Sequence, residues 1–254
     1  MTSRDRQLDC VRVSVSLSLS EVGRGDPQRA IVVALDILRA STTIVTAFRN
    51  GCAEIIPVAS VDEAREIARL RPGVLLCGER GGRRIDGFDL GNSPLEYTRE
   101  SVSGRSLVLT TTNGTAALSR YRGFERIVGC FANVHSVVRH LLASCRDRDV
   151  VLVCAGEHGK PGIEDIACAG AIVSLVREGC GEIDCDDGAL TAAAVWKHFG
   201  EDAVAAVSAG SHSRDLCRIG FGRDVEYCSR IGEGPVPWMA AGADSIFAGE
   251  GGVC

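Results

Sequence analysis

Short apolar segments of strand type alternate with helix-like segments along most of the chain, and this alternation limits the fold more than any other feature. AIVVAL at 30–35 is a continuous apolar run, typical of a strand that is buried on both faces. The expected strands cover 11–20, 30–35, 54–58, 74–77, 106–110, 126–131 and 149–156. The expected helices lie within 38–51, 60–71, 115–121, 133–146 and 163–179. Such alternation predicts an α/β protein with three layers (α/β/α), in which helices cover both faces of a mostly parallel, mixed sheet.

The two ends of the chain differ from this alternating middle. VRVSVSLSLS at 11–20 alternates apolar residues with Ser, which predicts a strand with one face in water. Beyond Gly181 the pattern is mainly helical, and a Gly-rich tail at 232–254 shows no clear element. With 254 residues, the chain has the length of one large or two small domains, and we expect a single domain over 1–254.

Composition and charge exclude several classes of protein. The net charge of −5 argues against a nucleic-acid partner, because such proteins carry a basic surface. No run approaches the roughly 18 apolar residues of a membrane span, and the first ten residues lack the apolar core of a signal peptide. The 12 Cys are scattered, several of them in apolar runs, as free buried thiols are. We therefore expect a reduced, cytoplasmic protein without membrane contact. Exposed apolar strands would suit a homodimer.

Acidic residues follow several of the expected strands. Asp36 comes directly after the strand at 30–35, Glu79 follows 74–77, and Glu164 and Asp165 open the helix after 149–156. The carboxyl ends of parallel strands form the ligand-binding edge of such a sheet. If these carboxylates converge there, they can hold a hard cation such as Mg²⁺. The alternatives are a helix N-cap at Asp36 and simple complementation of a helix dipole by Glu164 and Asp165.

The segment LVLTTTNGTAAL at 107–118 ends a buried strand in small hydroxyls and an Asn-Gly pair. A Gly lets the backbone come close to a ligand, and successive N–H groups with small hydroxyls can surround an anion. The alternative is an ordinary turn with Ser/Thr capping. The segment has neither the Lys of a Walker A loop nor a GxGxxG pattern. The candidate anion-binding residues are Thr111, Thr112, Asn113, Gly114 and Thr115.

Basic residues near the same strand ends complete the candidate site. Arg39 and Arg80 can pair with oxyanions in a bidentate manner. His158 and His212 are either surface turn residues, the commoner case, or proton donors to a leaving oxygen.

One short motif offers a different chemistry. Cys77 and Arg83 have the Cys-x5-Arg spacing of tyrosine-phosphatase loops, in which a thiolate of low pKa attacks phosphorus. Leu76 stands where that family has His, and a chance match is easy in a chain with 12 Cys.

Five segments taken together are more specific than any one of them. DILRASTT (36–43), GERGG (78–82), GFDLGNSP (87–94), TTTNGT (110–115) and EDIACAG (164–170) occur in this order and resemble the 2-phosphosulfolactate phosphatase family over roughly residues 30 to 230. The resemblance implies a three-layer fold and an Mg²⁺-dependent phosphatase that hydrolyses (2R)-2-phospho-3-sulfolactate to 3-sulfolactate and phosphate. In methanogens this step belongs to coenzyme M biosynthesis, and the family is also widespread in bacteria that do not make coenzyme M. The Glu157-His158 pair and the tail at 232–254 depart from the family pattern.

The resemblance and the residues lead to one hypothesis for the site. The metal ligands are Asp36, Glu79, Glu164 and Asp165 or a subset of them; Arg39 assists catalysis; and Arg80, Asn92, Ser93 and the turn at 111–115 bind the small anionic substrate. Asp36 either attacks phosphorus to form an aspartyl-phosphate or only holds the cation while water attacks. Two alternatives remain, namely a phosphatase for another small organic phosphate and a non-catalytic sensor of phosphorylated metabolites.

Overall fold

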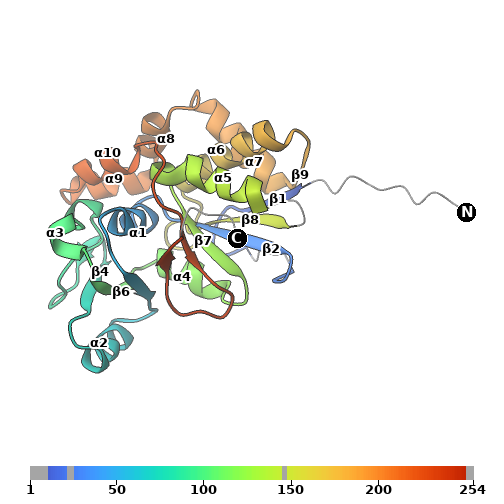
Figure 1. The fold of residues 1–254 in the computed structure, drawn as a ribbon. Helices are drawn as coiled ribbons and strands as arrows, with labels where there is room; N and C mark the ends of the chain where they lie inside the picture. Colours follow the sequence, from blue (N-terminus) through green and yellow to red (C-terminus); the bar gives the residue numbers. More distant parts are fainter. Residues whose placement is uncertain (1–10, 22–25, 145–147, 250–254) are drawn as a thin grey trace, which may run out of the picture.

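The computed structural model describes residues 11–21, 26–144 and 148–249. Its strands form two separate sheets with helices around them (Figure 1). The α/β class with mostly parallel, mixed pairing is confirmed. The alternation of elements does not reveal the division into two sheets, because the sequence of a buried strand does not show which strand it pairs with.

The larger sheet has seven strands in the order β11-β10-β7-β2-β8-β1-β9. Its centre is parallel, and β10 and β11 add antiparallel strands at one edge. All six residues of β2 are buried, because β7 and β8 flank it and helices cover its faces. The strands are β1 (Val11–Ser16), β2 (Ala30–Leu35), β7 (Glu125–Gly129), β8 (Asp149–Cys154), β9 (Ile183–Cys185), β10 (Pro237–Met239) and β11 (Phe247–Ala248).

Helices lie on both faces of this sheet. Figure 1 shows α5, α6 and α7 on one side of the strands and α4 on the other. Three further helices, α8, α9 and α10, extend beyond the end of α6 toward the smaller sheet. The bounds are α4 (Gly114–Arg120), η2 (Phe131–Asn133), α5 (Val134–Ser144), α6 (Ile163–Cys180), α7 (Asp187–His198), α8 (Ala203–Ala209), α9 (Ser211–Arg218) and α10 (Gly222–Cys228). The last two residues of the helix expected at 133–146 lie outside the described residues.

The smaller sheet is an insertion between α1 (Ala40–Arg49) and α4. Its order is β3-β6-β4-β5, with parallel pairing except at the β5 edge. It has a hydrophobic cluster of its own, made of Ile56, Val58, Ala64, Phe88 and Val108. Its elements are β3 (Glu54–Pro57), α2 (Val61–Leu70), β4 (Leu75–Arg80), β5 (Arg83–Arg84), η1 (Pro94–Glu96), α3 (Arg99–Val102) and β6 (Ser106–Thr110).

The position of the site follows from the strand order of the larger sheet. The chain leaves β2 toward β7 on one side, whereas it leaves β8 through α6 toward β9 on the other. In parallel α/β sheets, a crevice opens outside the carboxyl ends of two neighbouring strands whose connections diverge in this way, and ligands bind there. This rule places the ligand-binding region, called the crevice below, beyond Leu35 and Cys154.

The first strand is shorter and more enclosed than its alternating pattern predicts. It covers Val11–Ser16 and lies between β8 and β9 rather than at an edge. Ser16 and Ser18 are buried, because α7 packs against this part of the sheet. The expectation of one face in water is therefore wrong for the end of this strand.

The tail that the sequence left without an element joins the two sheets over its described part, 232–249. β10 pairs with β7 of the larger sheet, and Ile246 forms an antiparallel bridge with Ile55 of β3 in the smaller one. Arg126 is buried and donates to the carbonyls of Ala240 and Ala243. The tail thus links the two sheets to each other.

No helix in the described ranges combines the length and apolar character that a bilayer crossing requires.

The bridge at Ile246 predicts a clear effect on stability. Ile246 is fully buried, whereas its neighbour Phe247 is 44% exposed. Ile246→Ala should lower the free energy of unfolding by about 2–5 kcal/mol, the usual cost of truncating a buried Ile. Phe247→Ala is the matched control and should cost much less. Urea unfolding monitors both, and equal, small losses would show that the tail does not hold the sheets together.

Candidate active site

One carboxylate ties together the two loops that leave β2 and β8. Asp165, in the first turn of α6, accepts hydrogen bonds from the N–H groups of Ile37 (2.8 Å) and Gly156 (2.9 Å), one bond on each oxygen. Burial, together with the charges of Glu164 and Asp36, raises the pKa of Asp165 well above its usual range. Both oxygens of this predicted metal ligand thus hold backbone groups of the two loops.

Asp36 lies in the crevice at the end of β2. Its Oδ1 accepts a hydrogen bond from Ala40 N–H (3.1 Å), and its carbonyl accepts one from Ser41 N–H (2.8 Å). The residue therefore does contribute to the start of α1, as a cap would. Burial raises its pKa to about 6; the charge of His212 and the Ala40 bond oppose this rise, and nearby Glu79 and Glu164 add to it.

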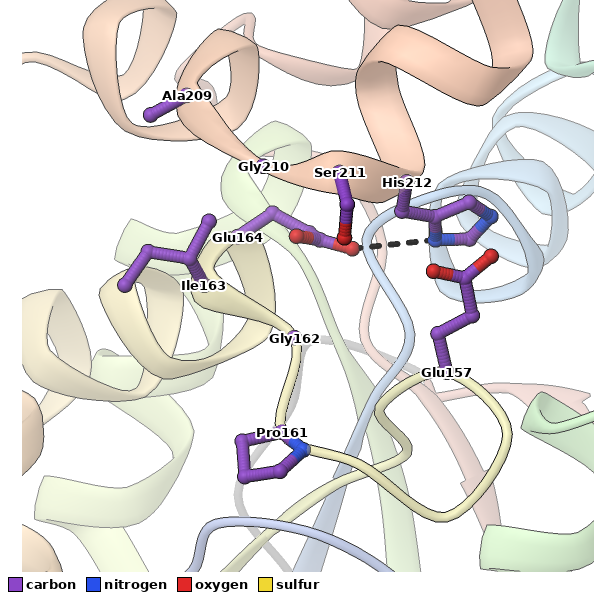
Figure 2. A pocket seen from close by; sticks show the side chains of 9 residues that line it. All are labelled: Glu157, Pro161, Gly162, Ile163, Glu164, Ala209, Gly210, Ser211 and His212. Carbon is purple, nitrogen blue, oxygen red and sulfur yellow. Dashed lines mark hydrogen bonds and ion pairs between the residues drawn. The ribbon is translucent and has the colours of Figure 1, made fainter.

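Glu164 lines a cavity of about 260 Å³ next to the crevice (Figure 2). Its Oε1 lies 3.2 Å from Nδ1 of His212, whereas its buried Oε2 has no hydrogen-bond partner within the described residues. Burial alone would lower the pKa of His212, but the bond with Glu164 and the charges of Glu164, Glu157 and Asp36 outweigh it and raise the pKa to about 9. Figure 2 shows the Glu157 carboxylate facing the His212 ring.

The two histidines singled out in the sequence have different surroundings. His212, the first-turn residue of α9, lines the cavity. His158 is exposed, with a positive φ of 51°, and belongs to a surface turn.

One residue of the TTTNGT turn, Thr112, binds a carboxylate of the protein itself, that of Glu79. Both the N–H (2.8 Å) and the hydroxyl (2.9 Å) of Thr112 donate to Oε1 of Glu79. Oε2 of Glu79 accepts from Gly82 N–H (2.8 Å). Glu79 is thus a predicted metal ligand whose two oxygens are already engaged.

The same turn also caps α4. Thr111 Oγ1 accepts from Thr115 N–H (3.1 Å), and the Thr115 hydroxyl donates back to the Thr111 carbonyl. The N–H groups of Asn113 and Gly114 have no acceptor among the residues that the structure describes. The capping interpretation of the turn is therefore confirmed, and anion binding by these two N–H groups stays a prediction.

Gly114 brings this turn against Asp36. A methyl group at position 114 would lie 2.7 Å from Asp36 Oδ2 and 2.5 Å from the Ala40 Cβ. Only a residue without a side chain fits there, so the absence of a Cβ sets the distance between the turn and Asp36.

The two predicted arginines differ in availability. Arg39 is buried, donates to Asp224 (2.6 Å) and to the Gly82 carbonyl (2.5 Å), and stacks on Phe221 at 4.2 Å from the ring centre. Arg80 is exposed at the end of β4 and donates to its neighbour's carbonyl and to Thr110 Oγ1 (3.0 Å). An exposed guanidinium can turn to a ligand, whereas Arg39 is held inside the protein.

Asn92 and Ser93 are buried in the segment before η1. The Ser93 hydroxyl donates to Asp224 (2.8 Å), and the Asn92 carbonyl accepts from the Thr43 hydroxyl (2.9 Å). Oδ1 of Asn92 is buried and has no partner within the described residues. These contacts connect the inserted sheet to α1 and α10.

Cys77 does not have the surroundings of a tyrosine-phosphatase nucleophile. The residue is fully buried in β4, and its thiol donates to the Leu75 carbonyl. Burial raises the thiol pKa far above its ordinary value, the opposite of what a reactive thiolate needs.

A divalent cation fits part of the predicted ligand set. Within the described residues, no three His, Cys, Asp or Glu side chains form a group that could hold a metal on its own. Glu79 and Asp165 accept hydrogen bonds on both oxygens, whereas among the described residues Oε2 of Glu164 is buried without a partner. Glu164, with Asp36 beside the turn, is therefore the ligand that we favour. Mg²⁺ is commonly held by one or two carboxylates, with substrate phosphate and water completing its shell.

Sequence reasoning missed Asp224, which binds both Arg39 and Ser93. Asp224 is 185 positions from Arg39 and lies in a short helix of mixed polarity. The spacing of apolar residues in this helix therefore does not show that Asp224 is buried. The sequence also does not show that Asp165 holds two loops together, because its partners are backbone N–H groups, which every residue type except Pro carries.

Comparison with known proteins identifies the family. The sequence model of the family described as 2-phosphosulpholactate phosphatase matches residues 18–238. Proteins named "probable 2-phosphosulfolactate phosphatase" are similar: one from Thermotoga petrophila is 42% identical over 197 residues, covering 78% of this chain and 83% of the relative. One from Caldanaerobacter subterraneus subsp. tengcongensis is 40% identical over 203 residues (79% and 83%), and one from Deinococcus radiodurans is 37% identical over 217 residues (84% and 89%).

The chain belongs to the 2-phosphosulfolactate phosphatase family, a family of phosphoric monoester hydrolases, which confirms the resemblance seen in its motifs. The family match ends at 238, so β11 and the bridge at Ile246 lie beyond it.

The contact between Gly114 and Asp36 yields a prediction for activity. Gly114→Ala should lower phosphatase turnover about 100-fold or more, because the new methyl must displace Asp36 or α4, and displacements of about 1 Å have such effects. Gly123→Ala is the control, since no atom lies within 4 Å of the position that its Cβ would occupy. Steady-state kinetics measures both variants. Equal rates for Gly114→Ala and the native enzyme would mean that the turn is not part of the site.

Proposed function

We propose that this protein hydrolyses 2-phospho-3-sulfolactate, or a closely related phosphorylated hydroxy acid, at the crevice beyond β2 and β8. The observation that carries the proposal is the juxtaposition of Asp36 Oδ2 with the turn whose Asn113 and Gly114 N–H groups have no acceptor among the described residues. A carboxylate and N–H donors placed this close together can act on one phosphoryl group. Family membership supports the sulfonated substrate, which the relatives' names share.

Charge balance supports a requirement for Mg²⁺. Asp36, Glu79, Glu164 and Asp165 are each at most 7% exposed, and His212 is the basic side chain in contact with one of them. Bringing a phosphate, a sulfonate and a carboxylate to this acidic site is unfavourable without further positive charge. In the proposal, Asp36 and Glu164 hold the cation, which when bound neutralises charge on the phosphoryl oxygens.

The chain's own residues supply the remaining steps. The N–H groups of Asn113 and Gly114, together with the exposed Arg80 at the end of β4, orient the phosphoryl group. Besides holding the cation, Asp36 either acts as the nucleophile, whose carboxylate forms a bond to phosphorus as the bond to the substrate oxygen breaks, or it holds the cation only, while water attacks. Water later releases phosphate from an aspartyl-phosphate if that species forms. Asp36 is essential in both routes.

Phosphate release from 2-phospho-3-sulfolactate is the direct test of the proposal. Release should occur with Mg²⁺, stop when a chelator removes it, and return when Mg²⁺ is added back. A panel of phosphorylated hydroxy acids without the sulfonate should react at least about 10-fold more slowly, the discrimination expected from one lost ionic contact. Absence of release from every ester, with tight anion binding, would favour a non-catalytic sensor instead.

Asp36→Asn should abolish turnover, by about 1,000-fold or more, without unfolding the protein. The ionised carboxylate is disfavoured by burial in the native state, where its pKa is about 6, so a neutral amide should not lower the melting temperature. Asp62→Asn, at an exposed position in the first turn of α2, is the control for loss of one negative charge. A rate near that of the native enzyme in Asp36→Asn would remove Asp36 from the mechanism.

A further inference from the structure

A continuous series of polar contacts leads from α10, outside the crevice, to the turn at 111–114. It begins with the ion pair between Asp224 and Arg39, whose side chains are 3% and 2% exposed and whose closest atoms are 2.6 Å apart. Asp224 also accepts from Ser93 on its other oxygen. A pair this buried keeps one geometry, because water cannot replace either partner.

Arg39 connects Asp224 to the tip of the β4–β5 hairpin, where Gly82 lies. Its second terminal nitrogen donates to the Gly82 carbonyl, while its guanidinium lies over the ring of Phe221. Leu216 and Ile219 pack against the same glycine from the α9 side. A planar guanidinium can serve a carboxylate, a carbonyl and an aromatic face at once, which an ammonium cannot do.

Gly82 and Glu79 complete the series. The Gly82 N–H donates to Oε2 of Glu79, and Oε1 of Glu79 accepts from the N–H and the hydroxyl of Thr112. Every link from Asp224 to Thr112 is thus a direct hydrogen bond of 2.5–2.9 Å.

These contacts matter to the site because its two parts, Asp36 and the turn at 111–114, come from different sheets. Asp36 ends a strand of the larger sheet, whereas the turn at 111–114 follows β6 of the smaller one. We propose that Arg39 and Asp224 are positioning residues, which set the turn at 111–114 against Asp36 through Gly82 and Glu79. The catalytic consequence of this proposal rests on the proposed function, whereas the structural link does not.

Arg39→Lys tests the link because it keeps the charge but cannot hold both Asp224 and the Gly82 carbonyl. Amide hydrogen exchange at Gly82 and Thr112 should accelerate at least about 10-fold, while exchange at Val151 in the core of β8 stays unchanged. With substrate, kcat should fall at least about 10-fold with KM within about threefold, since geometry rather than a substrate contact is altered. Asp224→Asn should give the same pattern and serves if Arg39→Lys does not fold.

Arg148→Lys is the matched control. Arg148 also bridges a carboxylate and a carbonyl, those of Glu125 (2.8 Å) and Ala30 (3.2 Å), but at the amino ends of β7 and β2, away from the crevice. Its substitution should leave kcat and the exchange of Thr112 unchanged.

Two results would overturn the proposal. One is unchanged exchange at Gly82 and Thr112 in both variants. The other is equal acceleration at Val151, which would show a loss of overall stability alone. Exchange needs no substrate, so a native enzyme that releases no phosphate would refute the proposed function while exchange still decides the positioning role.

Discussion

The exclusion of water from four acidic side chains is the constraint on which the rest of the structure depends. Asp36, Glu79, Glu164 and Asp165 gather at the carboxyl ends of strands, where burial makes their negative charges costly. The protein offsets part of this cost with directed N–H donors at Glu79 and Asp165 and with His212 at Glu164. The compensation is incomplete, because the pKa values of Asp36 and Asp165 stay raised and Oε2 of Glu164 has no partner among the described residues. We assign a cation to Asp36 and Glu164.

The two-sheet architecture explains how such a site is built and kept open. The larger sheet supplies Asp36 and the divergent connections that form the crevice, and the inserted sheet supplies the turn that faces it. The two sheets share one apolar core, to which Ile55, Leu107 and Leu109 of the smaller sheet contribute. The bridge of Ile246 with Ile55 and the contacts of Arg39 with Asp224 and Gly82 add further links.

The sequence predicts those features that depend on local pattern. Asp36 was expected at the ligand-binding edge because a buried strand precedes it, and the turn at 111–115 because small hydroxyls and Gly end another strand. Features that depend on distant partners were not predictable: the sequence does not show that Asp224 binds Arg39 or that Thr112 binds Glu79. The separation into two sheets was hidden for the same reason, because strand pairing is decided over long distances in the chain.

The central claim is that the uncompensated charge at Asp36 and Glu164 holds a divalent cation. Anomalous diffraction from crystals grown with Mn²⁺ in place of Mg²⁺ tests it most directly, because the signal marks the ion without assumptions about chemistry. The account predicts one peak in contact with the carboxylates of Asp36 and Glu164. A peak bound instead by other carboxylates, or none in crystals of enzyme that the same Mn²⁺ activates, would contradict it.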